Sequence, residues 1–233
     1  MGRLREYCYN EINVNRKVYD EWTLIRFLRR GDFKVAATKV IFDNHLKWVE
    51  KENIDKILHN DFSRSTELAH KHYHHSFTGI DKLGRPINVE RFKYFEAKPV
   101  IEMFNSDPSL WSNYFIREEE NLLNVILPYC SKMAGRRIDT NLCICDIKGM
   151  DIRPLLGSEC KPFLNVFIDI GTNHYPALFG QMYVVNAGWM FTFIWAMVKV
   201  WISEKTKNKV KIFGKNYKKE LYKICDPSQL PEF

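Results

Sequence analysis

The residues best suited to chemistry are lysines gathered towards the end of the chain. Residues 199–233 hold nine lysines and four acidic residues, a local charge of +5, which leaves +2 of the net +7 for the preceding 198 residues. Clustered lysines attract polyanions, either nucleic acid or the anionic face of a membrane. No arginine follows Arg153, and lysine without arginine favours diffuse attraction to phosphates over the reading of bases. We therefore expect an anionic membrane surface as partner and no nucleic acid.

Histidines form a second candidate group: His59, His70, His72, His74 and His75. On a strand, alternate members of this run would share one face at a spacing of about 6–7 Å. A metal site needs converging ligands, usually with a carboxylate or thiol partner. We see no such partner, so we expect surface histidines on a strand and no metal.

The six cysteines show neither a CxxC pair nor the spacing of a zinc site. Cys143 and Cys145 lie in an apolar run, where thiols behave as small hydrophobes. Because the sequence around Met1 shows no signal peptide, we expect a cytoplasmic protein with reduced thiols.

Catalytic motifs are absent from the sequence. Gly79 and Gly84 lack the spacing of a nucleotide-binding loop, and there is no Gly-x-Ser-x-Gly elbow. We expect the three glutamates at 118–120 to form a solvated helix face, and Asp146 to cap a turn after a buried strand. With no nucleophile and base brought together, we expect no enzymatic activity.

The composition is that of an ordinary globular protein, with 45% hydrophobic and 27% charged residues in 233. This excludes a disordered chain, a collagen-like repeat and a multi-pass membrane protein. Aromatic residues make up 14% of the chain, which suggests a wide apolar interior or a large apolar binding surface.

The elements that must position these residues follow from periodicity. Residues 1–62 are predicted to be helical, with a short helix over 23–30 and an amphipathic helix from Lys34. Beyond that, predicted strands alternate with predicted helices, which is typical of an α/β fold with a mostly parallel sheet. The strands are 72–77, 87–92, 142–145, 182–186 and 209–213; the helices are 108–134 (divided by Pro128), 162–171, 189–202 and 216–224.

The longest apolar stretch, residues 182–202, holds a single charge at Lys199. Asn186, Ala187 and Gly188 interrupt it where a strand would pass into a helix, so we do not expect a membrane span. The helix 189–202 is apolar on nearly all sides and must be buried on more than one of them. It is either a core helix or a movable gate with one side towards a cavity or a bilayer. Its apolar residues include Trp189, Phe191, Phe193, Ile194, Trp195, Met197, Val198 and Trp201.

Several motifs together resemble the CRAL-TRIO lipid-binding family, and within it the yeast-type phosphatidylinositol/phosphatidylcholine transfer proteins. In chain order they are Thr-Leu-Ile-Arg-Phe-Leu-Arg at 23–29, Asp-Lys-Leu-Gly-Arg-Pro at 81–86, Asp-Ile-Lys-Gly at 146–149, Tyr-Pro at 175–176 with Tyr-Val-Val-Asn-Ala at 183–187, and the lysine-rich ending at 205–231.

The resemblance implies an N-terminal helical bundle, residues 1–62, and a lipid-binding domain, residues 63–233. In that domain a mostly parallel sheet would floor a lipid pocket closed by a gate helix at 189–202. The family binds one lipid with its acyl chains in the pocket and exchanges it at membranes.

This chain matches the family at only some of the positions that contact the lipid headgroup. Thr206 and Lys209 match the Thr and Lys that follow the gate, and Asn141 aligns with a serine linked to choline headgroups. Gly31 and Ala177 stand where the family has an Arg and a Glu. Arg30 is a neighbouring cation that would replace the missing arginine.

The resemblance therefore implies phospholipid binding and transfer, of phosphatidylinositol, phosphatidylcholine or both. The alternative is a carrier of a sterol-like or squalene-like ligand without phosphoinositide specificity. We expect a phospholipid as ligand and no cofactor, a monomer because the gate must move, and reversible association with Golgi or endosomal membranes.

Overall fold

The computed structural model describes residues 19–151, 153–189, 191–200 and 202–232. The chain forms two compact units. Among the described residues, the first comprises residues 19–60 and 169–178, and the second comprises those that lie within 61–168 and 179–232. Two predicted gate residues lie partly or wholly outside the description: Trp201 is not described, nor is the side chain of Met197.

The first unit is built on α2 (Glu21–Arg30), α3 (Val35–Glu52) and α4 (Ile54–Leu58), with the π-helical turn η5 (Ile170–His174). Asp20 caps α2 by accepting a hydrogen bond from the Thr23 backbone N–H at 2.8 Å. Apolar side chains on one face of each helix meet in a small core. This core contains Leu24, Phe27, Leu28 and Phe42, with Tyr19, Ile41 and Leu46 packed against it.

The second unit is organised around a sheet whose described strands run in the order β1 (His75–Ile80), β2 (Pro86–Arg91), β3 (Asn141–Asp146), β4 (Phe179–Val185) and β5 (Val210–Ile212). β1 and β2 form an antiparallel hairpin, and each later pair is parallel. The α/β prediction with a mostly parallel sheet is confirmed.

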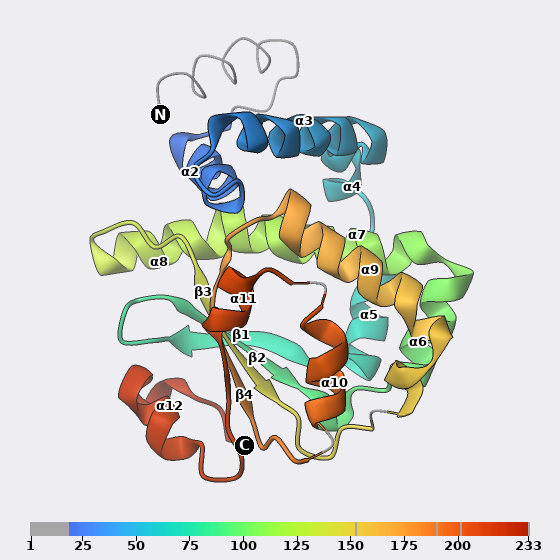
Figure 1. The fold of residues 1–233 in the computed structure, drawn as a ribbon, viewed down its shortest axis with the longest axis vertical. Helices are drawn as coiled ribbons and strands as arrows, with labels where there is room; N and C mark the ends of the chain where they lie inside the picture. The colour runs from blue at the N-terminus through green and yellow to red at the C-terminus, as the bar shows by residue number, and fades with distance from the viewer. Residues whose placement is uncertain (1–18, 152, 190, 201, 233) are drawn as a thin grey trace. The chain divides into compact units, whose positions relative to one another are not determined.

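Helices connect these strands, as Figure 1 shows. α5 (Ser63–His72) precedes β1. Between β2 and β3 lie η1 (Phe92–Tyr94), α6 (Ala97–Ser106), α7 (Pro108–Asn121), the π-helical turn η2 (Leu122–Ile126) and α8 (Leu127–Ala134). Next come η3 (Arg153–Leu156), η4 (Ser158–Cys160) and α9 (Lys161–Asp169), then α10 (Phe191–Val198) and α11 (Glu204–Lys209), and finally α12 (Lys218–Ile224) and η6 (Pro227–Gln229).

The two faces of the sheet carry different side chains because residues alternate along each strand. One face packs against α12 through a dense apolar core that includes Ile87, Ile144 and Leu221. The other face, called here the pocket face, carries Cys143, Cys145, Val184 and Met182, and Phe191 of α10 packs against it. Figure 1 shows α12 and α10 on opposite sides of the strands.

Three predicted elements differ from the structure. The predicted strand 72–77 is wrong in its first part, since α5 continues to His72 and β1 begins only at His75. Division of the helix 108–134 occurs, but through a π-helical turn at residues 122–126, ahead of Pro128. The apolar helix is shorter than predicted, because α10 spans only Phe191–Val198. Within the described residues, no helix combines the length and apolar character needed to cross a bilayer.

Candidate lipid pocket

A cavity of about 220 Å³ lies on the pocket face of the sheet, within the second unit. Its lining is overwhelmingly apolar and rich in aromatic rings. The floor comes from β2–β5 through Glu90, Cys145, Met182, Val184 and Val210; the walls include Tyr73, Phe92, Phe95, Phe115, Leu155, Phe163 and Phe167. A site of this kind binds hydrocarbon by removing it from water, with a few polar groups to orient the ligand.

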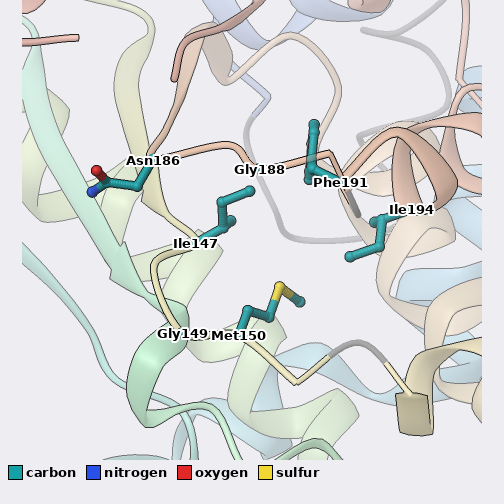
Figure 2. A pocket seen from close by; sticks show the side chains of 7 residues that line it. All are labelled: Ile147, Gly149, Met150, Asn186, Gly188, Phe191 and Ile194. Atoms are coloured by element: carbon teal, nitrogen blue, oxygen red, sulfur yellow. The ribbon is translucent and has the colours of Figure 1, made fainter. Parts of the chain in front are cut away.

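The inner face of α10 closes one side of this cavity. Phe191, Ile194, Trp195 and Val198 line it, at steps of three and four residues that place them on one face of the helix. A second, adjoining space of about 180 Å³ is shared by α10 and the loop after β3. Figure 2 shows Met150 and Ile194 pointing towards each other there, beneath Gly188 and Phe191.

The outer side of the same segment is exposed. Trp189 is 75% exposed and Phe193 55% exposed, and their rings lie 6.1 Å apart. Val200, just beyond the helix, is also exposed. A segment that lines an apolar cavity on one side and presents aromatic rings to solvent on the other matches the gate interpretation better than that of a covered core helix. The term gate helix is used below for α10.

Polar groups form a strip along the floor of the pocket face. Asn88 and Glu90 occupy every second position of β2, and Asn141, Cys143 and Cys145 do so on β3, so all five belong to the same face of the sheet. The Cys143 thiol lies 3.5 Å from Glu90 Oε1, and the Cys145 thiol lies 3.7 Å from Glu90 Oε2. The floor strip was not predicted from the sequence, because residues 142–145 form an apolar run. The alternation of Asn and Glu on β2 was the available signal.

The surroundings of the floor strip disfavour charge. Burial raises the pKa of the Glu90 carboxyl, against opposing hydrogen bonds from Cys143, Cys145 and Tyr73. The pKa of the Cys143 thiol is raised well above its ordinary value, first by its hydrogen bond with Cys145 and then by burial. Burial likewise raises the pKa of Tyr73. The surroundings therefore shift each of these three groups towards its uncharged form.

The glutamates at 118–120 do not form the solvated face that the sequence predicted. Glu120 is buried and accepts a hydrogen bond from Asn124 at 2.7 Å. Glu118 pairs with Arg117. Burial raises the pKa of Glu119 to about 7, with further contributions from the neighbouring negative charges of Glu118, Glu90 and Glu120. The charge-rich triplet misled the prediction because α7 is covered on most of its sides.

Three of the four predicted headgroup residues lie in the second unit. Lys209 Nζ donates a hydrogen bond to the carbonyl oxygen of Phe179 at 2.7 Å, and Asn141 pairs with Phe179 in the sheet register. Thr206 lies one turn before Lys209 on α11, whose amino end is capped by the Ser203 hydroxyl. Asn141 Oδ1 is buried and has no hydrogen-bond partner in the described part of the chain. The start of β4 thus brings Lys209 and Asn141 to the same strand end.

Arg30, the fourth predicted headgroup residue, belongs to the first unit. Its Nε donates to the Thr172 carbonyl oxygen at 3.2 Å and its Nη2 to Asn173 Oδ1 at 3.0 Å. Gly31 beside it has no room for a side chain, because a Cβ there would lie 2.2 Å from Thr38 Oγ1. Residue 31 therefore cannot carry an arginine on this backbone.

The histidines do not share a strand face. His70 is exposed on α5, whereas His72 is buried at the end of that helix and pairs with Glu96. Burial lowers the pKa of His75, whose Nε2 lies 2.6 Å from the Tyr114 hydroxyl. Within the described residues, the only group of three potential metal ligands in reach of one another lies elsewhere, at Glu90, Cys143 and Cys145.

Comparison with known families identifies this architecture. The family model of the CRAL/TRIO domain matches residues 70–233, more than two thirds of the chain. This chain belongs to the CRAL/TRIO family. The resemblance drawn from its motifs is thereby confirmed.

Curated relatives of this CRAL/TRIO protein carry lipid-transfer names. It is 30% identical over 217 residues to "Phosphatidylinositol/phosphatidylcholine transfer protein SFH11" of Arabidopsis thaliana, which covers 92% of this chain and 56% of that protein. It is 28% identical over 213 residues to "SEC14 cytosolic factor" of Kluyveromyces lactis, covering 91% and 69% of the two chains. The match to SFH7 of Arabidopsis thaliana spans 38% of that longer protein. The chain thus spans 34–56% of the length of the plant relatives that it matches.

A solved structure supports the same fold. The crystal structure of Sfh5 superposes with a TM-score of 0.69 at 19% sequence identity, over 88% of this chain and 69% of that one. At this level of identity, the likeness extends to the fold and leaves the ligand open.

Proposed function

We propose that this CRAL/TRIO protein binds one phospholipid in the cavity on its pocket face and exchanges it between membranes. The observation that carries the proposal is an apolar cavity closed on one side by the gate helix. Apolar side chains line the cavity, and the aromatic rings of Trp189 and Phe193 are exposed to solvent. The names of its curated relatives support phosphatidylinositol and phosphatidylcholine as the ligands.

The energetic reason for such a carrier lies in the acyl chains. Two chains expose on the order of 30 methylenes, at roughly 0.8 kcal/mol each, so a phospholipid leaves a bilayer into water extremely slowly. In a cavity lined by Phe, Leu and Val side chains, the acyl chains stay out of water while the lipid passes from one membrane to another. The protein then needs no bond chemistry, only a difference between a closed gate in solution and an open gate at the membrane.

Lys209 and Thr206 are proposed to contact the lipid phosphate, with Asn141 as a further polar contact. An ammonium group and a hydroxyl spaced one turn apart on α11 are suited to phosphate oxygens. The buried oxygen of Asn141 that lacks a partner among the described residues would accept a hydrogen bond from a headgroup.

The location proposed for this activity is the cytoplasm, with reversible docking of a monomer on anionic Golgi or endosomal membranes. The positive charge of residues 199–233 supports attraction to such surfaces. The aromatic rings of Trp189 and Phe193 supply apolar contact at the interface.

Native mass spectrometry of the purified chain, followed by vesicle-to-vesicle exchange of labelled phosphatidylinositol and phosphatidylcholine, tests the proposal. We expect a co-purified phospholipid and protein-dependent exchange. Ile194→Asp, on the cavity side of the gate helix, should abolish lipid retention, whereas Thr192→Asp, on its exposed side, should retain the lipid. Failure of both lipids to bind and move would overturn the proposal.

A second candidate, favoured by one specific observation, is a carrier of a sterol-like or squalene-like ligand. Gly31 admits no side chain, and Ala177 offers no carboxylate, so two polar positions that the family uses for inositol headgroups are lost. A co-purified neutral lipid without phosphorus would favour this candidate.

A further inference from the structure

The floor strip contains an unusually tight group of metal-ligating atoms. The Cys143 and Cys145 sulfur atoms lie 3.6 Å apart, and each lies within 3.7 Å of a different oxygen of the Glu90 carboxyl. All three ligating atoms fall within 4.8 Å of one another. No disulfide joins the two thiols, which are free.

A tetrahedral thiolate–carboxylate site sets the distances expected between the three ligating atoms. With zinc–sulfur bonds of about 2.3 Å and zinc–oxygen bonds of about 2.0 Å, tetrahedral angles require a sulfur–sulfur distance of about 3.8 Å and sulfur–oxygen distances of about 3.5 Å. The observed sulfur–sulfur distance of 3.6 Å is close to this geometry. The sulfur–oxygen distances of 3.5 and 3.7 Å join the two thiols to different oxygens of Glu90, so its carboxyl would have to turn to present one oxygen to both sulfurs. Binding of a cation would therefore require movement of the Glu90 side chain.

The scaffold that holds the three groups is rigid. Cys143 and Cys145 alternate on β3, so both thiols point to the pocket face. Glu90 lies directly across from Cys145 in the parallel register of β2 and β3. Ligands on two central strands of one sheet are positioned more firmly than ligands on loops, which lowers the cost of assembling a site.

Two of the three groups, Glu90 and Cys145, border the cavity, so a fourth ligand would approach from there. Tyr73 lines the same cavity. Three protein ligands and one open position form the usual arrangement where a bound zinc ion meets a further oxygen ligand.

We propose that Glu90, Cys143 and Cys145 form a binding site for a thiophilic divalent cation of the zinc class, with its fourth position facing the cavity. Sulfur ligands select such ions over magnesium and calcium, which prefer oxygen. A ligand oxygen in the cavity would occupy the fourth position. The inference goes beyond the proposed lipid exchange and does not depend on it.

Cobalt(II) is the probe of choice for this site, since thiolate–cobalt charge transfer absorbs where protein without a thiolate site does not. The full chain, reduced and stripped of metal with a chelator, is titrated with cobalt(II) and then with zinc(II). We expect a thiolate charge-transfer band that saturates at one equivalent of cobalt and is abolished by one equivalent of zinc. Magnesium(II) should leave the band unchanged.

Variants assign the site to its residues. Cys143→Ala, Cys145→Ala and Glu90→Gln should each weaken zinc affinity at least tenfold. Cys225→Ala is the matched control, because Cys225 is a buried free cysteine on the opposite face of the sheet, and it should leave the affinity unchanged. Because a variant in the core can unfold, the fold of each variant is checked by circular dichroism. Alkylation of the wild-type thiols with and without zinc, mapped by peptide mass, identifies the protected cysteines without any substitution.

Absence of the charge-transfer band, or zinc protection spread over Cys160 and Cys225 as well, would overturn the metal site. Equal cobalt binding by Cys143→Ala and the unsubstituted chain would do the same. Lipid exchange by the metal-stripped protein is measured alongside. Exchange without metal binding would overturn the metal site alone, and metal binding without exchange would overturn the lipid proposal alone.

Discussion

Asp81 belongs to a family motif that stabilises a turn of the fold and does not line the cavity. Its Oδ1 accepts hydrogen bonds from the backbone N–H groups of Leu83 and Arg85 at 2.9 and 2.8 Å, and its Oδ2 accepts from Arg85 Nε at 2.6 Å. Gly84, with φ of 76°, completes the turn between β1 and β2. The Asp-x-x-Gly-Arg-Pro pattern therefore fixes a hairpin turn, and the buried ion pair lies outside the cavity.

Replacing Asp81 tests this structural role. Asp81→Ala leaves the largely buried Arg85 guanidinium without its carboxylate and frees two backbone donors, so we expect a loss of about 3 kcal/mol in the free energy of unfolding. Urea denaturation measures it. Asp151→Ala removes the partner of Arg153 in an exposed pair and serves as control, with no measurable loss expected. Equal effects in the two variants would contradict the structural role of the motif.

Glu119 makes stability depend on pH. Its pKa is raised from 4.5 to about 7, so between these values the native chain keeps a proton that the unfolded chain has lost. The free energy of unfolding must therefore fall as pH rises from about 4.5 to about 7, and the loss persists above. Glu119→Gln should match the wild type near pH 4.5 and exceed its stability by about 1–3 kcal/mol at pH 8.

Thermal denaturation at pH 4.5, 6 and 8 measures this effect of Glu119. Glu102→Gln, an exposed change on α6, is the control and should follow the wild-type profile. If Glu119→Gln also lost stability with rising pH in parallel with the wild type, burial of Glu119 would not be the cause.

At the scale of elements, the aromatic rings of α10 and of Trp189 ahead of it are either exposed or turned towards the cavity. Trp189 and Phe193 are exposed, so their replacement removes little buried area, whereas Phe191 and Ile194 line the cavity. Trp189→Ser with Phe193→Ser should weaken binding to lipid vesicles at least tenfold, since two aromatic anchors are lost at the interface. Vesicle co-sedimentation measures the binding.

The same double variant should keep its bound lipid and its melting temperature, because neither ring lines the 220 Å³ cavity on the pocket face. Ile194→Ala provides the comparison, with reduced lipid retention and little change in vesicle binding. A double variant that binds vesicles as the wild type does would rule out the exposed rings as membrane anchors.

Helices and strands could be predicted where apolar residues recur at helical or strand spacing, and they were missed where the buried residues are small or polar. Strand β3 is a buried apolar run and was found. Helix α5 buries Ser65, Ala69 and His72 at helical spacing, but small and polar residues hide that period from a hydrophobic pattern. The floor strip was missed for a different reason, because Glu90 and the two cysteines are more than 50 residues apart and only the parallel register of β2 and β3 brings them together.

At the scale of the molecule, charge and apolar surface are concentrated in the same part of the sequence. Lys199 borders a groove with Trp189 and Trp195, and the exposed Lys215 follows Gly214 of that groove. Each lysine near an anionic membrane contributes about 1 kcal/mol, and the attraction fades within a Debye length of about 10 Å at 0.1 M salt. Membrane docking should therefore combine a salt-sensitive charge contribution with a salt-insensitive contribution from the gate aromatics.

Charge reversal separates a local lysine patch from net charge. Lys199→Glu with Lys215→Glu should weaken binding to vesicles containing phosphatidylserine at least tenfold at low salt, and the difference from wild type should shrink as salt approaches 1 M. Lys56→Glu with Lys71→Glu changes the net charge equally at exposed lysines elsewhere in the chain and should have a much smaller effect. Equal loss in both double variants would mean that net charge alone governs docking. Unchanged binding of the first variant would leave the aromatic residues of the gate as the sole anchor.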